Sequence, residues 1–376
     1  MHIAFNRPFI SGKEPAYLEE AFRGQLSGDG SFTKKCHALL EQELGVKRAL
    51  LTTSCTHALE MAALLLDLQP DDEVIVPAFT FVSSINAFVL QKARPRFIDV
   101  RADTLNLDEA RLEDLINPRV KAIVVVHYAG VACEMDAILA IAQRHGIPVI
   151  EDNAHGLFGQ YKGRYLGTLG CMATQSFHET KNFTCGEGGA LLINDPSYSE
   201  RAEIIREKGT NRSRFFRGQV DKYTWVDVGS SYLPSDLLAA FLLAQLESRE
   251  LIQAKRKRIW EYYYENLKDW AGEHGTQLPF IPSHCDQSYH MFYLLLPSLE
   301  LRQNLIAHLN SRDINSVFHY LPLHLSDMGR KLGGKDGDCP VTEDVSDRLL
   351  RLPFYTGLTE EAQALVVSAI KEFKPV

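Results

Sequence analysis

The stretch FHETKNFTCGEGG, residues 177–189, holds a single lysine, Lys181, among polar and glycine residues. It lies between two apolar runs that are typical of buried strands. Upstream, the apolar run VIED ends in Asp152, also at the end of an expected strand. A lysine amine that forms a Schiff base and a carboxylate that keeps a ring nitrogen protonated are groups that a pyridoxal 5′-phosphate (PLP) enzyme requires. The two residues therefore suggest PLP chemistry without settling it.

The segment TTSCTHALEMA, residues 52–62, adds a third part of such a site. It reads as a junction between a strand and a helix, with hydroxyl groups at Thr53, Ser54 and Thr56. Free N–H groups at the start of a helix, together with hydroxyls, can hold a phosphate. We expect this junction to be the phosphate cradle if the protein binds PLP.

Other chemistries find weaker support in the sequence. Glycine-rich dinucleotide and P-loop motifs are absent, since GDGSF and GEGG have the wrong spacing, and there is no Gly-x-Ser-x-Gly elbow. The segment HYAGVACEMD offers His127, Cys133, Glu134 and Asp136 as metal ligands, but we expect no metal there.

The elements that must position these residues form a repeating pattern. Apolar runs predict strands within 48–54, 72–81, 94–100, 121–130, 147–156, 172–179 and 189–195. Helical periodicity at 56–68, 83–93 and 134–146 alternates with several of them. This order predicts an α/β fold whose mostly parallel sheet is flanked by helices. Because ligands of such sheets bind beyond the carboxyl ends of the strands, we expect the polar and aromatic residues that follow the runs to converge there.

The remainder of the chain predicts a second, smaller domain. Residues 235–270 read as one long helix or a bent pair, followed by a strand in 289–297, a helix at 301–313, a strand in 314–322 and a terminal helix at 360–374. Residues 333–347, GGKDGDCPVTEDVSD, look like an exposed loop. We expect a large domain at 1–240 and a small α+β domain at 241–376.

The composition narrows the class of protein. The 376 residues are 45% hydrophobic and 23% charged with a formal net charge of −8, so nucleic acid and anionic membranes are poor partners. No signal peptide or membrane-spanning run is evident. The seven cysteines are scattered and form no Cys-x-x-Cys pair, which favours reduced thiols. We therefore expect a cytoplasmic protein.

Several motifs, in order along nearly the whole chain, resemble the DegT/DnrJ/EryC1/StrS family of sugar aminotransferases, which are fold-type-I PLP enzymes. The matching segments are PAFTFVSSINA, DV followed by DTLNLD, HYAG followed by EMD, VIEDNAHG, SFHETKN followed by GEGG, EKGTNR and HYLPLH. Within the family, the segments SGDGSFTKKC, SCTHALEMAALLLD and GSSYLPSD are most similar to the transaminases that make dTDP-4-amino-4,6-dideoxygalactose for enterobacterial common antigen.

The resemblance implies roles around PLP for particular residues. Lys181 matches the Schiff-base lysine, Asp152 the partner of the pyridine nitrogen, His155 the residue near the phenolic oxygen and Phe81 the aromatic ring stacked on the cofactor. The positions that would hold the phosphate are Cys55, Thr56 and Ser176.

For the substrates, the resemblance implies that His319, Tyr320 and His324 face the sugar. Many family members place an asparagine from the partner subunit near the cofactor phosphate, where this chain has Ser231, whose shorter side chain leaves that contact open. Arg212 could instead face a phosphate or carboxylate, because arginine forks suit both.

The implied reaction moves an amino group from L-glutamate to the C4 ketone of dTDP-4-dehydro-6-deoxyglucose, in a homodimer with shared active sites. Amination at C3 or of another nucleotide sugar remains open. A PLP-dependent sugar dehydratase, in which the family position of Lys181 holds histidine, and a regulator without turnover fit less well.

Overall fold

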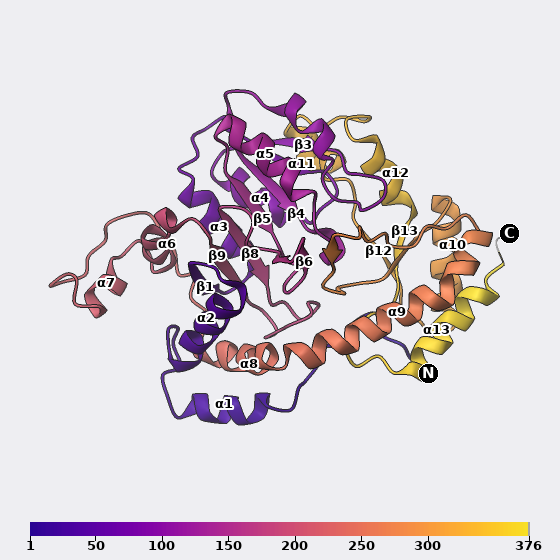
Figure 1. Cartoon of the computed structure of the whole chain (residues 1–376), viewed down its shortest axis with the longest axis horizontal. Helices are drawn as coiled ribbons and strands as arrows, with labels where there is room; N and C mark the ends of the chain where they lie inside the picture. Colours follow the sequence, from indigo (N-terminus) through magenta and orange to yellow (C-terminus); the bar gives the residue numbers. More distant parts are fainter. Residues whose placement is uncertain (375–376) are drawn as a thin grey trace.

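The computed structural model describes residues 1–374 and contains a central seven-stranded sheet in the order β1-β9-β8-β5-β4-β2-β3 (Figure 1). Its strands are β1 (Arg48–Thr52), β2 (Glu73–Pro77), β3 (Arg94–Ile98), β4 (Val120–Val126), β5 (Val149–Asp152), β8 (Met172–Ser176) and β9 (Gly189–Ile193). Strands β3, β2, β4, β5 and β8 pair in parallel, while β9 is antiparallel to both of its neighbours. The mostly parallel α/β sheet predicted from the sequence is thus confirmed.

Helices cover both faces of this sheet because successive side chains of its strands are apolar in both directions. On one face, Leu50, Val74 and Val124 pack against α3 (Cys55–Leu65), α4 (Ser83–Leu90) and α6 (Ser199–Arg206). On the other, Leu51 packs with α2 (Ser31–Leu44) and α8 (Asp236–Glu247), and Ile123 packs with α5 (Met135–His145). A sheet buried in this way leaves only its strand ends for ligands.

A second apolar core lies in the C-terminal part of the chain. The three-stranded sheet β11-β13-β12 packs against α9 (Arg249–Glu273), α10 (Leu299–Asn310) and α13 (Glu360–Glu372), with Ile3 from the N-terminus among them. Its strands are β11 (Tyr293–Leu295), β12 (Val317–Phe318) and β13 (Leu349–Arg351). The expected long segment is a bent pair, α8 and α9, which meet at Ser248.

The packing of α8 bears on the proposed division at residue 240. Leu242, Leu243 and Leu246 of α8 belong to the core of the large sheet, whereas the C-terminal core begins on α9 at Ile259. The two-domain division itself remains a proposal, and these contacts favour a junction along α9.

Shorter elements complete the chain. They are α1 (Glu14–Phe22), β6 (Gln160–Tyr161), β7 (Arg164–Tyr165), α7 (Arg212–Phe216), β10 (Cys285–Asp286), α11 (Asp327–Lys331) and α12 (Pro340–Arg348). Strands β10, β6 and β7 form a small sheet of their own. None of the helices within residues 1–374 is long and apolar enough to cross a membrane.

The expectation of an exposed loop at 333–347 is wrong for its second half, which forms α12. Pro340 is the first residue of the helix, a position that proline favours because its missing N–H has no helical partner there. The buried carboxylate of Asp99, after β3, accepts hydrogen bonds from the N–H groups of Val341 and Thr342 and from Oγ1 of Thr342, at 2.8–2.9 Å. A side chain distant in sequence therefore caps this helix, which local sequence could not reveal.

Candidate active site

A cavity of about 570 Å³ opens at the carboxyl ends of the parallel strands, where the C-terminal part of the chain faces the large sheet. Residues expected at the site that line it are Cys55, Thr56, Phe81, Asp152, His155, Ser176, Lys181, His319 and Tyr320. They come from five separate segments, and the sheet topology brings them together.

Lys181 follows β8 and is surrounded by the cavity lining, with no carboxylate within ion-pair distance among the described residues. Burial lowers the pKa of Lys181 from 10.5 to about 8, and the nearby charge of Asp152 offsets only part of that effect. An amine with this pKa is partly neutral near physiological pH and can then act as a nucleophile.

This pKa predicts how the cofactor-free protein takes up PLP. Because only the neutral amine attacks an aldehyde, the covalent uptake rate should rise about tenfold per pH unit below pH 8 and level off above it. Stopped-flow absorbance over pH 6–10 measures this, with N-acetyl-lysine giving the intrinsic pH dependence of PLP. A rate that kept rising to pH 10 would show that Lys181 titrates as an exposed lysine does.

Asp152 ends β5 on the floor of the same cavity and is 5% exposed. Its Oδ2 accepts a hydrogen bond from Ser84 Oγ at 2.7 Å, and its Oδ1 accepts one from the Ala154 N–H at 3.2 Å. Burial nevertheless raises the pKa of Asp152, because these bonds and Lys181 compensate only part of the lost hydration. A bound cation such as a protonated ring nitrogen would stabilise this carboxylate.

His155 forms one wall of the cavity, stacked on His290 with ring centroids 4.2 Å apart. Burial holds the pKa values of both imidazoles well below 6.5, so both are neutral. Asn182 Nδ2 donates to the carbonyl of Ser288, so its Oδ1 accepts from His290 Nδ1 at 2.9 Å. His155 Nδ1 is buried without a hydrogen-bond partner, as expected of a group that awaits a ligand.

The start of α3 faces the cavity near Asp152. Ser54 caps the helix by accepting a hydrogen bond from the His57 N–H at 3.1 Å, and Thr56 Oγ1 lies 2.9 Å from Ser83 Oγ. Gly189 passes so close to the Ser54–Cys55 peptide that a Cβ there would collide with its backbone. Free N–H groups and hydroxyls at this helix start suit a phosphate.

These features together fit PLP. The cavity offers an amine for an aldehyde, a buried carboxylate for a pyridine nitrogen and a helix start for a phosphate, placed on separate walls. Phe81 also lines it with a 57% exposed ring that is free to stack on a planar ligand, while Tyr320 lies 6.4 Å from that ring.

Three residues that the sequence analysis placed at the site do not line this cavity. His324 is fully buried and bonds through Nε2 to Glu343 Oε1 at 2.9 Å, so its expected contact with the sugar is not supported. Ser231 and Arg212 line a different cavity of about 660 Å³. Arg212 is 3.5 Å from Glu207 there.

The structure adds residues that the sequence analysis missed. Phe5, His290 and Arg351 line the cavity, and Ser84 donates a hydrogen bond to Asp152. Arg351 had a recognisable signal, since it is a charged residue within the apolar run LLRLPFY. The others became apparent only when the chain ends and strands were packed together.

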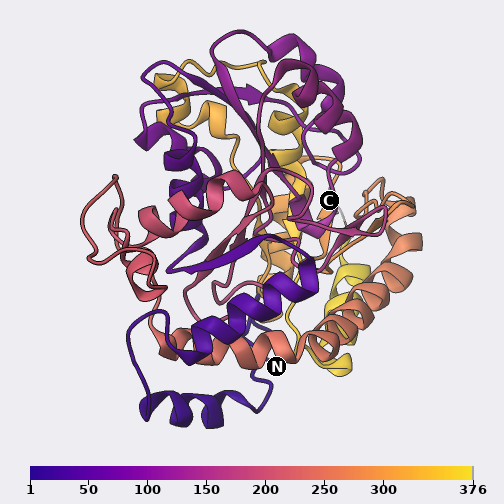
Figure 2. The same cartoon turned by 60° about the vertical axis from the view of Figure 1, so that its left-hand side comes forward.

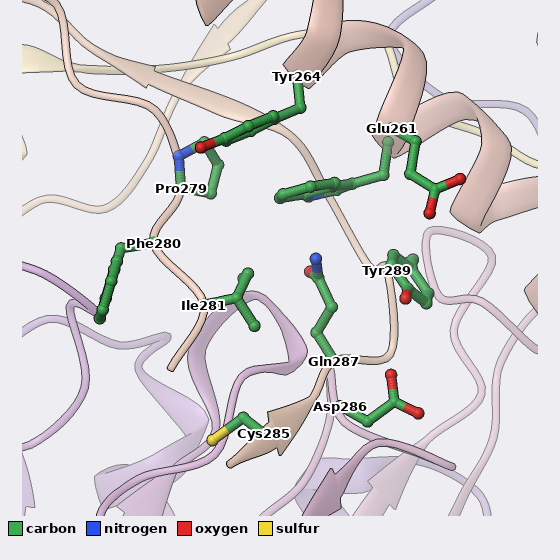
Figure 3. Close-up of a pocket in the computed structure, with 10 residues that line it drawn as sticks. Glu261, Tyr264, Pro279, Phe280, Ile281, Cys285, Asp286, Gln287 and Tyr289 are labelled. Atoms are coloured by element: carbon green, nitrogen blue, oxygen red, sulfur yellow. The ribbon is translucent and has the colours of Figure 1, made fainter. Parts of the chain in front are cut away.

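A further cavity of about 380 Å³ lies behind the segment Cys285–Tyr289 (Figure 3). Aromatic and acidic side chains line it, among them Tyr264, Phe280, Glu261 and Asp286. It contains no lysine or arginine, so it lacks the groups that a phosphate or an aldehyde would need.

The sequence matches the model of the DegT/DnrJ/EryC1/StrS aminotransferase family over residues 8–371. The chain belongs to this family. The resemblance noted from motifs is therefore confirmed at the level of the family.

Individual relatives agree with the assignment. The aminotransferase is 34% identical to the uncharacterized protein MJ1066 of Methanocaldococcus jannaschii, over 97% of this chain and 96% of that protein. It is 30% identical to the spore coat polysaccharide biosynthesis protein SpsC of Bacillus subtilis, over 98% and 96%. The PLP form of the putative sugar aminotransferase Spr1654 from Streptococcus pneumoniae superposes with a TM-score of 0.91 at 26% identity, covering 99% of this chain and 98% of that one.

Spr1654 has been solved in both PLP and pyridoxamine-phosphate (PMP) forms. The present protein is a PLP-dependent aminotransferase of this family. Its reaction requires an amino donor and an acceptor.

Proposed function

We propose that this aminotransferase moves an amino group from L-glutamate to the C4 ketone of dTDP-4-dehydro-6-deoxyglucose, giving dTDP-4-amino-4,6-dideoxygalactose in the cytoplasm. The observation that carries the amino-transfer chemistry is the half-buried Lys181 amine, with its lowered pKa, in one cavity with Asp152. The choice of sugar rests on the segments SGDGSFTKKC, SCTHALEMAALLLD and GSSYLPSD.

In this proposal Lys181 binds PLP and moves protons. PLP supplies an aldehyde that carries the amino group from one substrate to the other and a ring that withdraws electrons from the reacting carbon. In the donor half-reaction, Lys181 Nζ would remove the proton from the α-carbon, and a water molecule would supply the keto oxygen of the departing 2-oxoglutarate. In the sugar half-reaction, C4 would lose its carbonyl oxygen as water and Lys181 Nζ would deliver a proton to C4 before the amino sugar leaves.

The other residues orient and hold the cofactor. Asp152 would keep the pyridine nitrogen protonated, Cys55, Thr56 and Ser176 would hold the phosphate, and Phe81 would stack on the ring; all five line the cavity. His155 Nδ1, which lacks a partner, would bond a cofactor oxygen. His319 and Tyr320 line the same cavity and would face the sugar.

Product analysis tests the proposed substrate. Purified protein with PLP and L-glutamate is mixed separately with dTDP-4-keto, dTDP-3-keto and UDP-4-keto sugars, and products are identified by mass spectrometry and NMR. We expect one amine at C4 with galacto configuration from the first substrate. Amination at C3 would show that the proposed substrate is wrong and that the enzyme is still an aminotransferase. Loss of water would indicate a dehydratase.

We further propose a homodimer, because the arm at residues 207–230, which projects from the rest of the fold (Figure 2), carries exposed apolar side chains. Phe216 is 69% exposed and Trp225 is 76% exposed, and large exposed apolar groups gathered on one segment are typical of an interaction surface. A second copy covering the arm would bring Ser231 and Arg212 towards a neighbouring site.

Analytical ultracentrifugation should give the mass of two copies for the native chain. Trp225→Asp should shift the protein towards one copy, because a charge in an apolar interface is costly to bury. The exposed Leu251→Asp serves as control and should leave the mass unchanged. A monomer for the native chain would contradict the proposal.

A further inference from the structure

Arg351, like Lys181, is a basic residue of the active-site cavity with no carboxylate within ion-pair distance among residues 1–374. It lies on β13, the central strand of the small sheet, where its backbone is flanked by Tyr293 on one side and Val317 on the other. Its side chain lines the cavity, and the guanidinium lies 4.8 Å from the Phe5 ring. A strand paired on both edges holds such a group in a fixed position.

The hydrogen bonds of Arg351 are almost entirely unused. Its Nε is buried without a partner, and Nη1 reaches only Nε2 of His319, at the limiting distance of 3.5 Å. His319 is neutral, because burial holds its pKa well below 6.5. An arginine keeps its charge in proteins, so this one is a half-buried cation with almost no hydrogen-bond partners in the protein.

Arg256 shows what a structural arginine looks like in the same part of the fold. Its Nε and Nη2 donate to the carbonyls of Tyr289 and His290 at 2.9 and 2.6 Å, and its Nη1 donates to Thr356 Oγ1 at 3.3 Å. Every nitrogen of that guanidinium has a partner within the protein. The contrast indicates that the partner of Arg351 arrives with a ligand, because a cation without one is costly to bury.

The position of Arg351 indicates which anion it awaits. A cofactor phosphate already has the start of α3 on the large-domain side. Arg351 lines the same cavity as Lys181 and His155, and its charge adds to burial in lowering the pKa values of both groups. In an α-amino acid the carboxylate is bonded directly to the reacting carbon, whereas in a nucleotide sugar several bonds separate C4 from the diphosphate. A cation that shares a cavity with the reacting amine is therefore better placed to bind the carboxylate of the amino acid than the diphosphate of the sugar.

We propose that Arg351 binds the α-carboxylate of the amino donor through its guanidinium fork and so orients the α-carbon towards Lys181. This inference rests on the proposed amino transfer and specifies how the donor is recognised. Two parallel N–H···O bonds to a carboxylate fix direction as well as distance. The sugar substrate has no carboxylate, so Arg351 would distinguish between the two half-reactions at one site.

The test compares Arg351→Met, Arg351→Lys and the matched control Arg348→Met, whose native guanidinium pairs with Asp344 and the Leu296 carbonyl. PLP-loaded protein is titrated with L-glutamate while the cofactor absorbance is followed, and PMP-loaded protein is titrated with the keto sugar. For Arg351→Met we expect about 100-fold weaker apparent affinity for glutamate and an affinity for the sugar within about threefold of the native value. The lysine variant should lose about tenfold, because it keeps the charge and loses the fork.

Binding of glutarate, measured by calorimetry on PLP-loaded protein, gives a readout that needs no turnover. Glutarate carries carboxylates without an amine, and its affinity should fall with Arg351→Met and not with Arg348→Met. Unchanged glutamate and glutarate affinities in Arg351→Met would overturn the inference, and so would equal losses for glutamate and sugar. If native protein binds glutarate through Arg351 but reacts with no keto sugar, the carboxylate site stands and the proposed function fails.

Discussion

Replacing Lys181 with alanine is expected to abolish covalent attachment of PLP and to lower turnover by at least about 10⁴-fold. The variant loses the amine that binds the cofactor and the group that moves the proton at the α-carbon and at C4. The other cavity residues are untouched, so PLP should still bind weakly through Asp152 and the start of α3.

The measurement is reduction with borohydride followed by mass spectrometry of the peptides, alongside steady-state rates. Native protein should carry the cofactor mass on a peptide containing residues 177–189, and Lys181→Ala should carry none. Lys268→Ala, an exposed position on α9 paired with Glu265, is the control and should match the native protein. Labelling at another lysine in the native protein would show that Lys181 is not the residue that binds PLP covalently.

Exchange of Asp152 for asparagine should cost about 10²–10⁴-fold in the rate of the glutamate half-reaction. Asparagine keeps the shape and can keep the bond to Ser84, but it cannot stabilise a protonated pyridine nitrogen. Removing one partner of a buried ion pair costs roughly 3–5 kcal/mol, and about 1.4 kcal/mol corresponds to a tenfold change in rate. The two figures give the expected range.

Single-turnover absorbance measurements with glutamate isolate this effect from sugar binding. Asp136→Asn is a matched control, because Asp136 is exposed and its partner Lys162 is remote from the cavity lining. An Asp152→Asn variant that binds PLP and reacts at the native rate would show that the carboxylate serves only to cap the turn after β5.

The expectations for the cofactor residues depended on their places at strand ends. Lys181, Asp152 and His155 each follow a strand in sequence, and parallel strands align their carboxyl ends at one edge of a sheet. For that reason the order of strands along the chain was enough to predict that residues from separate motifs meet. The roles of these residues remain proposals, whereas their convergence is a feature of the structure.

The expectations failed where a contact from a distant segment decides the local structure. His324 stood in a motif similar to the family pattern, yet Glu343 of α12 holds it away from the cavity. The helix α12 itself was expected to be a loop, because its capping carboxylate comes from Asp99 after β3. Arg351 interrupts an apolar run, but only the packing of the small sheet against the large one shows that its side chain lines the cavity.

The sequence alone determined the seven strands of the main sheet, the family and the PLP-dependent chemistry. These depend on local periodicity and on motifs that are contiguous in the chain. Only the tertiary structure decided which side chains share the cavity, how far burial lowers the pKa of Lys181, and that Arg351 faces it without a counterion. The physical reason is that burial and electrostatic compensation depend on all the segments packed around a group. Neighbours in sequence supply only some of those segments.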